Sequence, residues 1–218
     1  MAAKRPPAPP TVTAVPAIID SKPMAAPFVD VSDWTLNNPD RKMRDFGYDI
    51  LKRSHRGVEH SAAAYVRAKL RYPVGSLDLA GLHRDVMANR LLLPRGASDM
   101  LAQPDAVWRE MDNHFMKLDQ DLLAGPTIFF PGTVEQHWAT RQVMEFAQVA
   151  IADTWGAAVH VIAHAPARIA HASDFHVHVL CSAREVTSAG LGAFIRPILQ
   201  SGCQVSMKAA WDDWLSKS

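Results

Sequence analysis

The sequence predicts an α+β fold in which helices flank an antiparallel β-sheet. Strand-like and helix-like segments follow one another along the 218 residues without the regular alternation of a parallel fold. Two apolar runs, residues 157–164 and 175–184, lie on either side of a loop and are typical of an antiparallel strand pair. Eight of the fifteen prolines fall before residue 41. We therefore expect residues 1–40 to form a flexible tail and residues 41–218 to form one domain.

The first half of the domain contains three recognisable segments. Residues 46–54 mix apolar and polar side chains as a first strand would. The alanine-rich residues 57–72 predict a helix that begins near Glu59 or Ser61. Residues 78–94 form a second amphipathic stretch.

The second half places helices around the strand pair. Residues 98–123 predict a helix that begins near Pro104, and residues 125–132 predict a short strand between turn residues. Residues 133–156 predict a long helix that a terminal glycine ends. A closing helix is expected over residues 206–217.

The composition is that of a soluble globular protein, because 48% of the residues are hydrophobic, 21% are charged and the net charge is +1. No apolar run approaches the roughly 18 residues that span a membrane, and no secretory signal is recognisable at the start of the chain. Two cysteines, Cys181 and Cys203, predict no disulfide framework, so we expect a cytoplasmic protein. Residues 41–72 carry an excess of basic side chains, which indicates either a phosphate-binding surface or a solvated face.

The stretch FHVHVL at residues 175–180 carries two histidines one residue apart. In a strand, His176 and His178 point to one face, whereas the residues between them point to the other. If the loop before this strand is centred near Ala170, pairing places His164 opposite His176 and Ile162 opposite His178. Three neutral imidazoles would then meet, which suits a divalent ion such as Zn, Mn, Co or Ni. The alternative is that they are polar residues on the solvated face of a strand.

Together with the segments around them, these histidines resemble MobA/MobL-type relaxases, which belong to the HUH endonuclease superfamily. The tripeptide His176-Val177-His178 is similar to the His–apolar–His signature, and the preceding strand GAAVHVIAH places His164 where the family has its third metal ligand. The segment HSAAAYVRA resembles the family's alanine-rich helix, in which Tyr65 takes the place of the nucleophile.

Two further segments extend the resemblance over residues 44–216 in the correct order. LPRGASDMLAQPDAVWREMD resembles the family's segment around a tryptophan, here Trp108, and KAAWDDWL resembles its closing helix, with Trp211.

The resemblance implies metal-dependent, strand-specific nicking and rejoining of DNA at a plasmid or mobile-element transfer origin, through a 5′-phosphotyrosine intermediate. It implies a divalent metal cofactor, Mg or Mn in the first place, with Zn, Co or Ni as alternatives. Single-stranded DNA is the implied partner, together with accessory proteins of the relaxosome and no membrane. The residues that we expect to take part are Tyr65 as the nucleophile, His164, His176 and His178 as metal ligands, and Arg67, Lys69, Arg71 and Arg184 as DNA contacts.

Other functions remain open. A catalytically inactive, relaxase-like DNA-binding accessory protein would form no tyrosyl–DNA adduct. A histidine-triad nucleotide hydrolase would need a third alternating histidine, where this chain has Leu180. A metal-binding β-protein without a nucleic-acid partner would not bind single strands. Within the relaxase hypothesis, Tyr48 and Tyr72 are the rival nucleophiles, and Tyr72 lies about two helical turns after Tyr65.

Overall fold

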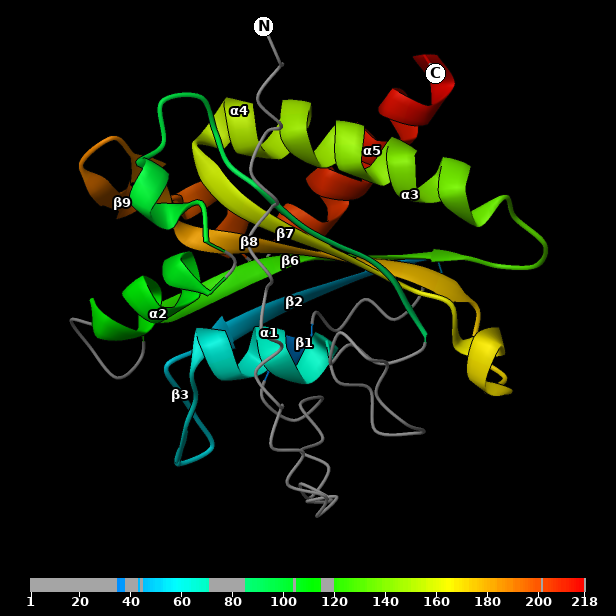
Figure 1. Cartoon of the computed structure of the whole chain (residues 1–218), viewed down its shortest axis with the longest axis horizontal. Helices are drawn as coiled ribbons and strands as arrows, with labels where there is room; N and C mark the ends of the chain where they lie inside the picture. The colour runs from blue at the N-terminus through cyan, green and yellow to red at the C-terminus, as the bar shows by residue number, and fades with distance from the viewer. Residues whose placement is uncertain are drawn as a thin grey trace, which may run out of the picture.

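The chain forms an antiparallel sheet with helices on both faces, as the sequence predicts (Figure 1). The structure is a computed structural model that describes residues 35–37, 43, 45–70, 85–103, 105–114, 120–200 and 202–217. The strand order is β1-β2-β6-β8-β7-β5, and β9 pairs with β8. The strands are β1 Thr35–Asn37, β2 Phe46–Lys52, β5 Val86–Leu92, β6 Asp121–Phe130, β7 Ala157–His164, β8 Phe175–Thr187 and β9 Gly190–Phe194. A separate hairpin joins β3 (Ser54–His55) to β4 (Val58–Glu59).

The helices lie in two layers on opposite sides of the sheet. In Figure 1, α3 and α5 lie above the sheet, and α1 lies below it. The helices are α1 Ala62–Leu70, α2 Ala106–Asn113, α3 Gln136–Phe146, α4 Asp153–Trp155 and α5 Cys203–Lys217, with a π-helical segment η3 at Ala147–Ala152. Short 3₁₀ turns are η2 Asp99–Leu101, η4 Pro166–Ile169 and η5 Arg196–Leu199.

Each face of the sheet has its own hydrophobic core. One core packs α3 and α5 against the sheet and includes Phe146, Val177 and Trp211. The other packs α1 and α2 against the opposite face and includes Trp108 and Ile162. Because side chains alternate along a strand, the histidines at positions 176 and 178 of β8 lie on this second face, which α1 and α2 cover.

The long helix predicted over residues 133–156 is a continuous helical path through α3, η3 and α4. It ends at Gly156, whose φ of 66° is left-handed and suits glycine. The glycine that the sequence marks as a terminator therefore ends the helix.

The helix predicted over residues 98–123 is much shorter in the structure. Within it, α2 ends at Asn113, and β6 has already begun at Asp121. Hydrogen bonding to two neighbouring strands keeps residues 121–123 in the sheet and overrides their helical spacing.

Three strands, β5, β6 and β9, differ from what the sequence predicts. Strand β6 continues through Gly125 and Pro126, which read as turn residues in the sequence. A β-carbon at Gly125 would lie 1.8 Å from the Val179 carbonyl oxygen, so the close approach of β8 requires glycine there. The amphipathic stretch 78–94 contains strand β5, and β9 was not predicted.

The predicted tail contains one strand of the sheet. Residues Thr35–Asn37 form β1 and pair with residues 49–51 of β2, whereas the rest of residues 1–40 lies outside the described residues. In the part of the chain that is described, no helix is both long enough and apolar enough to cross a membrane.

Candidate functional site

The predicted hairpin register is correct. His164 pairs with His176 and Ile162 pairs with His178 across β7 and β8. The three histidine rings lie together, with ring centres 5.2 Å apart for His164 and His176, 5.3 Å for His164 and His178, and 5.1 Å for His176 and His178. All three side chains are buried. The structure thus brings together the three histidines that the sequence nominates.

Each of the three rings uses Nδ1 to contact a protein oxygen. Nδ1 of His164 lies 3.1 Å from Oδ2 of Asp85. Nδ1 of His178 lies 2.8 Å from the hydroxyl of Thr127. Nδ1 of His176 lies 2.9 Å from the main-chain oxygen of Asp174, which can only accept, so this nitrogen carries the proton. The nitrogen with which each ring would coordinate an ion is therefore Nε2.

Two rings of the cluster, those of His176 and His178, are neutral at physiological pH. Burial, assisted by the charge of Lys69 and opposed by the hydrogen bond to the main-chain oxygen of Asp174, lowers the pKa of His176 to about 4. Burial, together with the charge of Lys69, also lowers the pKa of His178 well below its usual value. Neutral imidazole is the form that binds transition metals, so no proton has to leave these two rings before an ion binds.

Asp85 is a site residue that sequence reasoning missed. Its side chain is fully buried and contacts His164, and its main-chain oxygen accepts a hydrogen bond from Ala165 N at 2.7 Å. A carboxylate behind a ligand histidine fixes the ring and raises the basicity of its other nitrogen. The sequence offers one signal for this role, an acidic residue directly before strand β5. That signal is weak, because the histidine that Asp85 contacts lies 79 residues away in the sequence.

The donor set fits a divalent ion, although the rings are not arranged around one. Imidazoles that share an ion at about 2.1 Å have ring centres roughly 5 Å apart, as here. However, among the described residues no group of three or more His, Cys, Asp or Glu side chains has its donor atoms in metal-binding geometry. The two observations are compatible, because ring centres fix where the side chains lie, whereas coordination depends on ring rotation. Binding would require the rings to rotate.

His160 has a structural role on the same face. Its Nδ1 accepts a hydrogen bond from the indole Nε1 of Trp108 at 3.1 Å, and its Nε2 makes a short contact with Oδ1 of Asn89. Burial lowers the pKa of His160 to about 4, which keeps the ring neutral. Because both nitrogens bind protein groups, His160 is not available as a metal ligand.

Tyr65 lies on α1, which packs on the histidine face of the sheet. Its side chain is 1% exposed, and burial, with a smaller effect of Asp49, raises its pKa well above the usual value. Lys69, one turn further along α1, holds its Nζ 5.2 Å from the centre of the Tyr65 ring. The charge of Lys69 also acts on His176 and His178. Lys69 therefore interacts both with the predicted nucleophile and with the histidine cluster.

The structure separates the two rival tyrosines. Tyr48 belongs to the core on the opposite face of the sheet, and its hydroxyl donates to the main-chain oxygen of Ile198 at 2.7 Å. Tyr48 therefore cannot reach the histidines without crossing the sheet. Tyr72 lies outside the described residues.

The remaining predicted DNA contacts lie in different places. Arg67 is exposed and forms an ion pair with Asp105 at 2.8 Å. Arg184 donates from Nε to the Gly192 oxygen at 2.7 Å, and its guanidinium lies 5.2 Å from the Phe194 ring centre. At about 3.3 Å per residue, Arg184 lies roughly 20 Å along β8 from His178. Arg71 lies outside the described residues.

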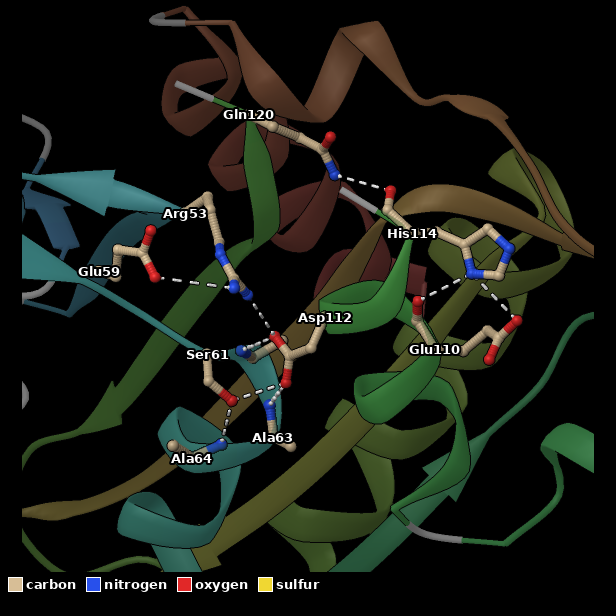
Figure 2. Close-up of polar contacts among 10 residues, drawn as sticks. Arg53, Glu59, Ser61, Ala63, Ala64, Glu110, Asp112, His114 and Gln120 are labelled. Atoms are coloured by element: carbon tan, nitrogen blue, oxygen red, sulfur yellow. Dashed lines mark hydrogen bonds and ion pairs between the residues drawn. The ribbon is translucent and has the colours of Figure 1, made fainter. Parts of the chain in front are cut away.

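The start of α1 is held by Asp112 from α2 (Figure 2). The Asp112 carboxylate accepts hydrogen bonds from the Ser61 hydroxyl at 2.6 Å, from Ala62 N at 2.7 Å and from Ala63 N at 3.1 Å. The Ser61 hydroxyl in turn accepts a bond from Ala64 N at 3.1 Å. The first-turn amides that lack a partner within the helix are thus satisfied, and the turn that leads to Tyr65 is fixed.

Comparison with known proteins identifies a shared fold. No protein-family model and no curated protein matches the sequence. A chain from the solved structures described as "Molecular Basis of Vancomycin Resistance Transfer in Staphylococcus aureus" is similar to this chain at 14% sequence identity. The match covers 79% of this chain and 90% of that chain, with a TM-score of 0.59. At that identity, the likeness shows that the two chains share a fold.

Proposed function

We propose that this protein is a relaxase-like nuclease that nicks and rejoins single-stranded DNA, with Tyr65 as the nucleophile. The observation that carries the proposal is that α1, with Tyr65 and Lys69, packs on the sheet face where the three histidines cluster. The shared fold adds support, because the similar structure is described as concerning the transfer of vancomycin resistance in Staphylococcus aureus.

The proposed reaction transfers the phosphoryl group at the cut site from the 3′ oxygen to Tyr65. The Oη–P bond to Tyr65 forms as the phenol loses its proton, and the P–O3′ bond breaks as the 3′ oxygen takes up a proton. The product is a 5′-phosphotyrosine with a free 3′ hydroxyl, and the reverse reaction rejoins the strand. Lys69 supplies positive charge for the phosphate, and Asp85 fixes the ring of His164.

A divalent ion held by His164, His176 and His178 would act as a Lewis acid on the nonbridging phosphate oxygens. Cationic charge is needed at this face, because His176 and His178 are neutral and the phenol of Tyr65 has a raised pKa. A neutral phenol is a poor nucleophile, so ionisation of Tyr65 must be favoured in the complex with substrate.

The test is the covalent adduct itself. The protein is incubated with single-stranded oligonucleotides from transfer origins and Mn or Mg, and denaturing gels show whether a protein–DNA adduct forms. Tyr65→Phe removes one oxygen and should abolish the adduct. Tyr48→Phe is the matched control, because Tyr48 lies on the opposite face, and it should keep the adduct. An adduct mapped to a peptide with Tyr72 alone would refute the assignment of Tyr65.

A second candidate is a relaxase-like DNA-binding protein without nuclease activity. The burial of Tyr65, which leaves 1% of its surface exposed, favours this candidate because a buried phenol does not meet a phosphate without movement of α1. Single-strand binding without an adduct under any metal would support it. An adduct that depends on Tyr65 would exclude it.

A further inference from the structure

Phe129 stands beside the histidine cluster on the same face of the sheet. In the register of β6 and β8, Phe129 pairs with His176. The two rings lie 5.5 Å apart between centres and are tilted by 35°. On its other side, Cε2 of Phe129 lies 3.6 Å from the position that a β-carbon on Gly47 would take. The ring therefore lies over the sheet between the backbone of β2 and the first histidine of the cluster.

Among the described aromatic residues on this face, Phe129 is partly exposed. Tyr65 and Trp108 pack on the same face but are 1% and 0% exposed. The side chain of Phe129 is apolar, so it contributes no charge and no hydrogen bond to the site. A partly exposed aromatic residue beside a proposed phosphate site is the arrangement in which aromatic side chains bind the bases of single strands.

We propose that Phe129 stacks on a base of the nucleotide next to the phosphate bound at the histidine cluster. This inference rests on the function proposed above and adds a contact with the base. Stacking on an apolar ring tolerates any base, so Phe129 would add affinity and fix the position of the strand without selecting its sequence. Selection of an origin would then depend on other contacts.

The adjacent residue provides a matched control. Phe130 is also partly exposed, but it points to the opposite face, where its ring centre lies 5.7 Å from Phe175 and 6.4 Å from Trp211. Phe129→Leu and Phe130→Leu remove the same ring from neighbouring positions. Phe129→Trp restores an aromatic ring at the proposed platform.

The experiment measures the affinity of each full-length variant for two probes by fluorescence anisotropy. One probe is oligothymidylate, and the other is an abasic strand of equal length and charge. Phe129→Leu should weaken oligothymidylate binding by about 5- to 150-fold, the size expected for one stacked base, and leave abasic binding unchanged. Phe130→Leu should change neither affinity, and Phe129→Trp should restore the parent's affinity.

Three results would overturn the inference. If Phe129→Leu weakens both probes equally, the effect is a loss of the fold or of phosphate binding. If Phe129→Leu changes neither probe while the Tyr65-dependent adduct still forms, stacking at Phe129 is wrong and the proposed nuclease stands. If the parent protein binds neither probe, both proposals fail together.

Discussion

Asp112 should control the stability of the helix that carries Tyr65. The first turn of α1 has no acidic residue of its own, so the Asp112 carboxylate supplies the negative charge at this helix end as well as the hydrogen-bond acceptors. Asp112→Ala removes the acceptor for Ala62 N, for Ala63 N and for the Ser61 hydroxyl. The Arg53 guanidinium, 3.9 Å from the carboxylate, also loses a partner.

The expected cost follows from the number of groups left without their acceptor. Hydrogen bonds to a charged group contribute about 1.5–3 kcal/mol each, but water replaces part of each bond at this partly exposed helix end. Loss of an N-cap alone costs about 1 kcal/mol. We therefore expect Asp112→Ala to lower the free energy of unfolding by about 2–4 kcal/mol. Asp112→Asn keeps an acceptor and loses the charge, so it should cost less.

Urea unfolding measures the free energy of each variant, and hydrogen exchange locates the effect. Amides of residues 62–65 should exchange faster in Asp112→Ala, because the first turn of α1 frays. Asp105→Ala is the control, since it removes an exposed ion pair with Arg67 from the same helix. That pair should contribute less than about 1 kcal/mol. If Asp112→Ala and Asp105→Ala have the same free energy of unfolding, Asp112 does not anchor α1 and the reasoning is wrong.

Two further predictions concern the histidines. Calorimetry with Mn or Ni should show strongly weakened metal binding after alanine replacement of His164, His176 or His178, and about 10- to 100-fold weaker metal binding in Asp85→Asn. The control His160→Gln should bind the metal like the parent protein. An equal loss of metal binding in His160→Gln would show that the cluster is misassigned. Acidification should destabilise the protein between pH 6.5 and 4. His160 and His176 have pKa values of about 4 in the folded protein, so as the pH falls these histidines take up protons in the unfolded chain before they do so in the folded protein. The stabilisation is therefore fully present above pH 6.5 and is lost as the pH falls towards 4, by about 3 kcal/mol for His160. Urea unfolding across this pH range measures the loss. A free energy of unfolding that does not change with pH would contradict the prediction.

The histidine hairpin was predictable because its information is local. Two nearly continuous apolar strands and one loop fix the register, since a shift of one residue would move His164 to the other core. The turn residue Ala170 has a φ of 58°, an unusual left-handed conformation for alanine that its residue type does not predict. The observed register nevertheless matches the one expected for a loop centred near Ala170.

The contacts that hold the site were not predictable because they join distant segments. Asp85 meets His164 across 79 residues, Asp112 meets Ser61 across 51, and Trp108 meets His160 across 52. No local pattern distinguishes these residues from other acidic or aromatic side chains. The helical spacing after Asn113 was misleading for the same reason, since the pairing of β6 between β2 and β8 decides the structure there.

The charges of the residues on the histidine face bear on the proposed nuclease reaction. The face presents neutral imidazoles at His176 and His178, a phenol with a raised pKa at Tyr65, and the ammonium group of Lys69. The rings of His176 and His178 add no positive charge, so the proposed attraction of a phosphodiester to this face relies on Lys69 and on a bound cation. The burial that keeps the imidazoles ready for a cation also keeps the phenol protonated. The proposed nuclease reaction would therefore require both a cation and access to Tyr65, and the adduct assay with metal present and absent separates a nuclease from a DNA-binding relative.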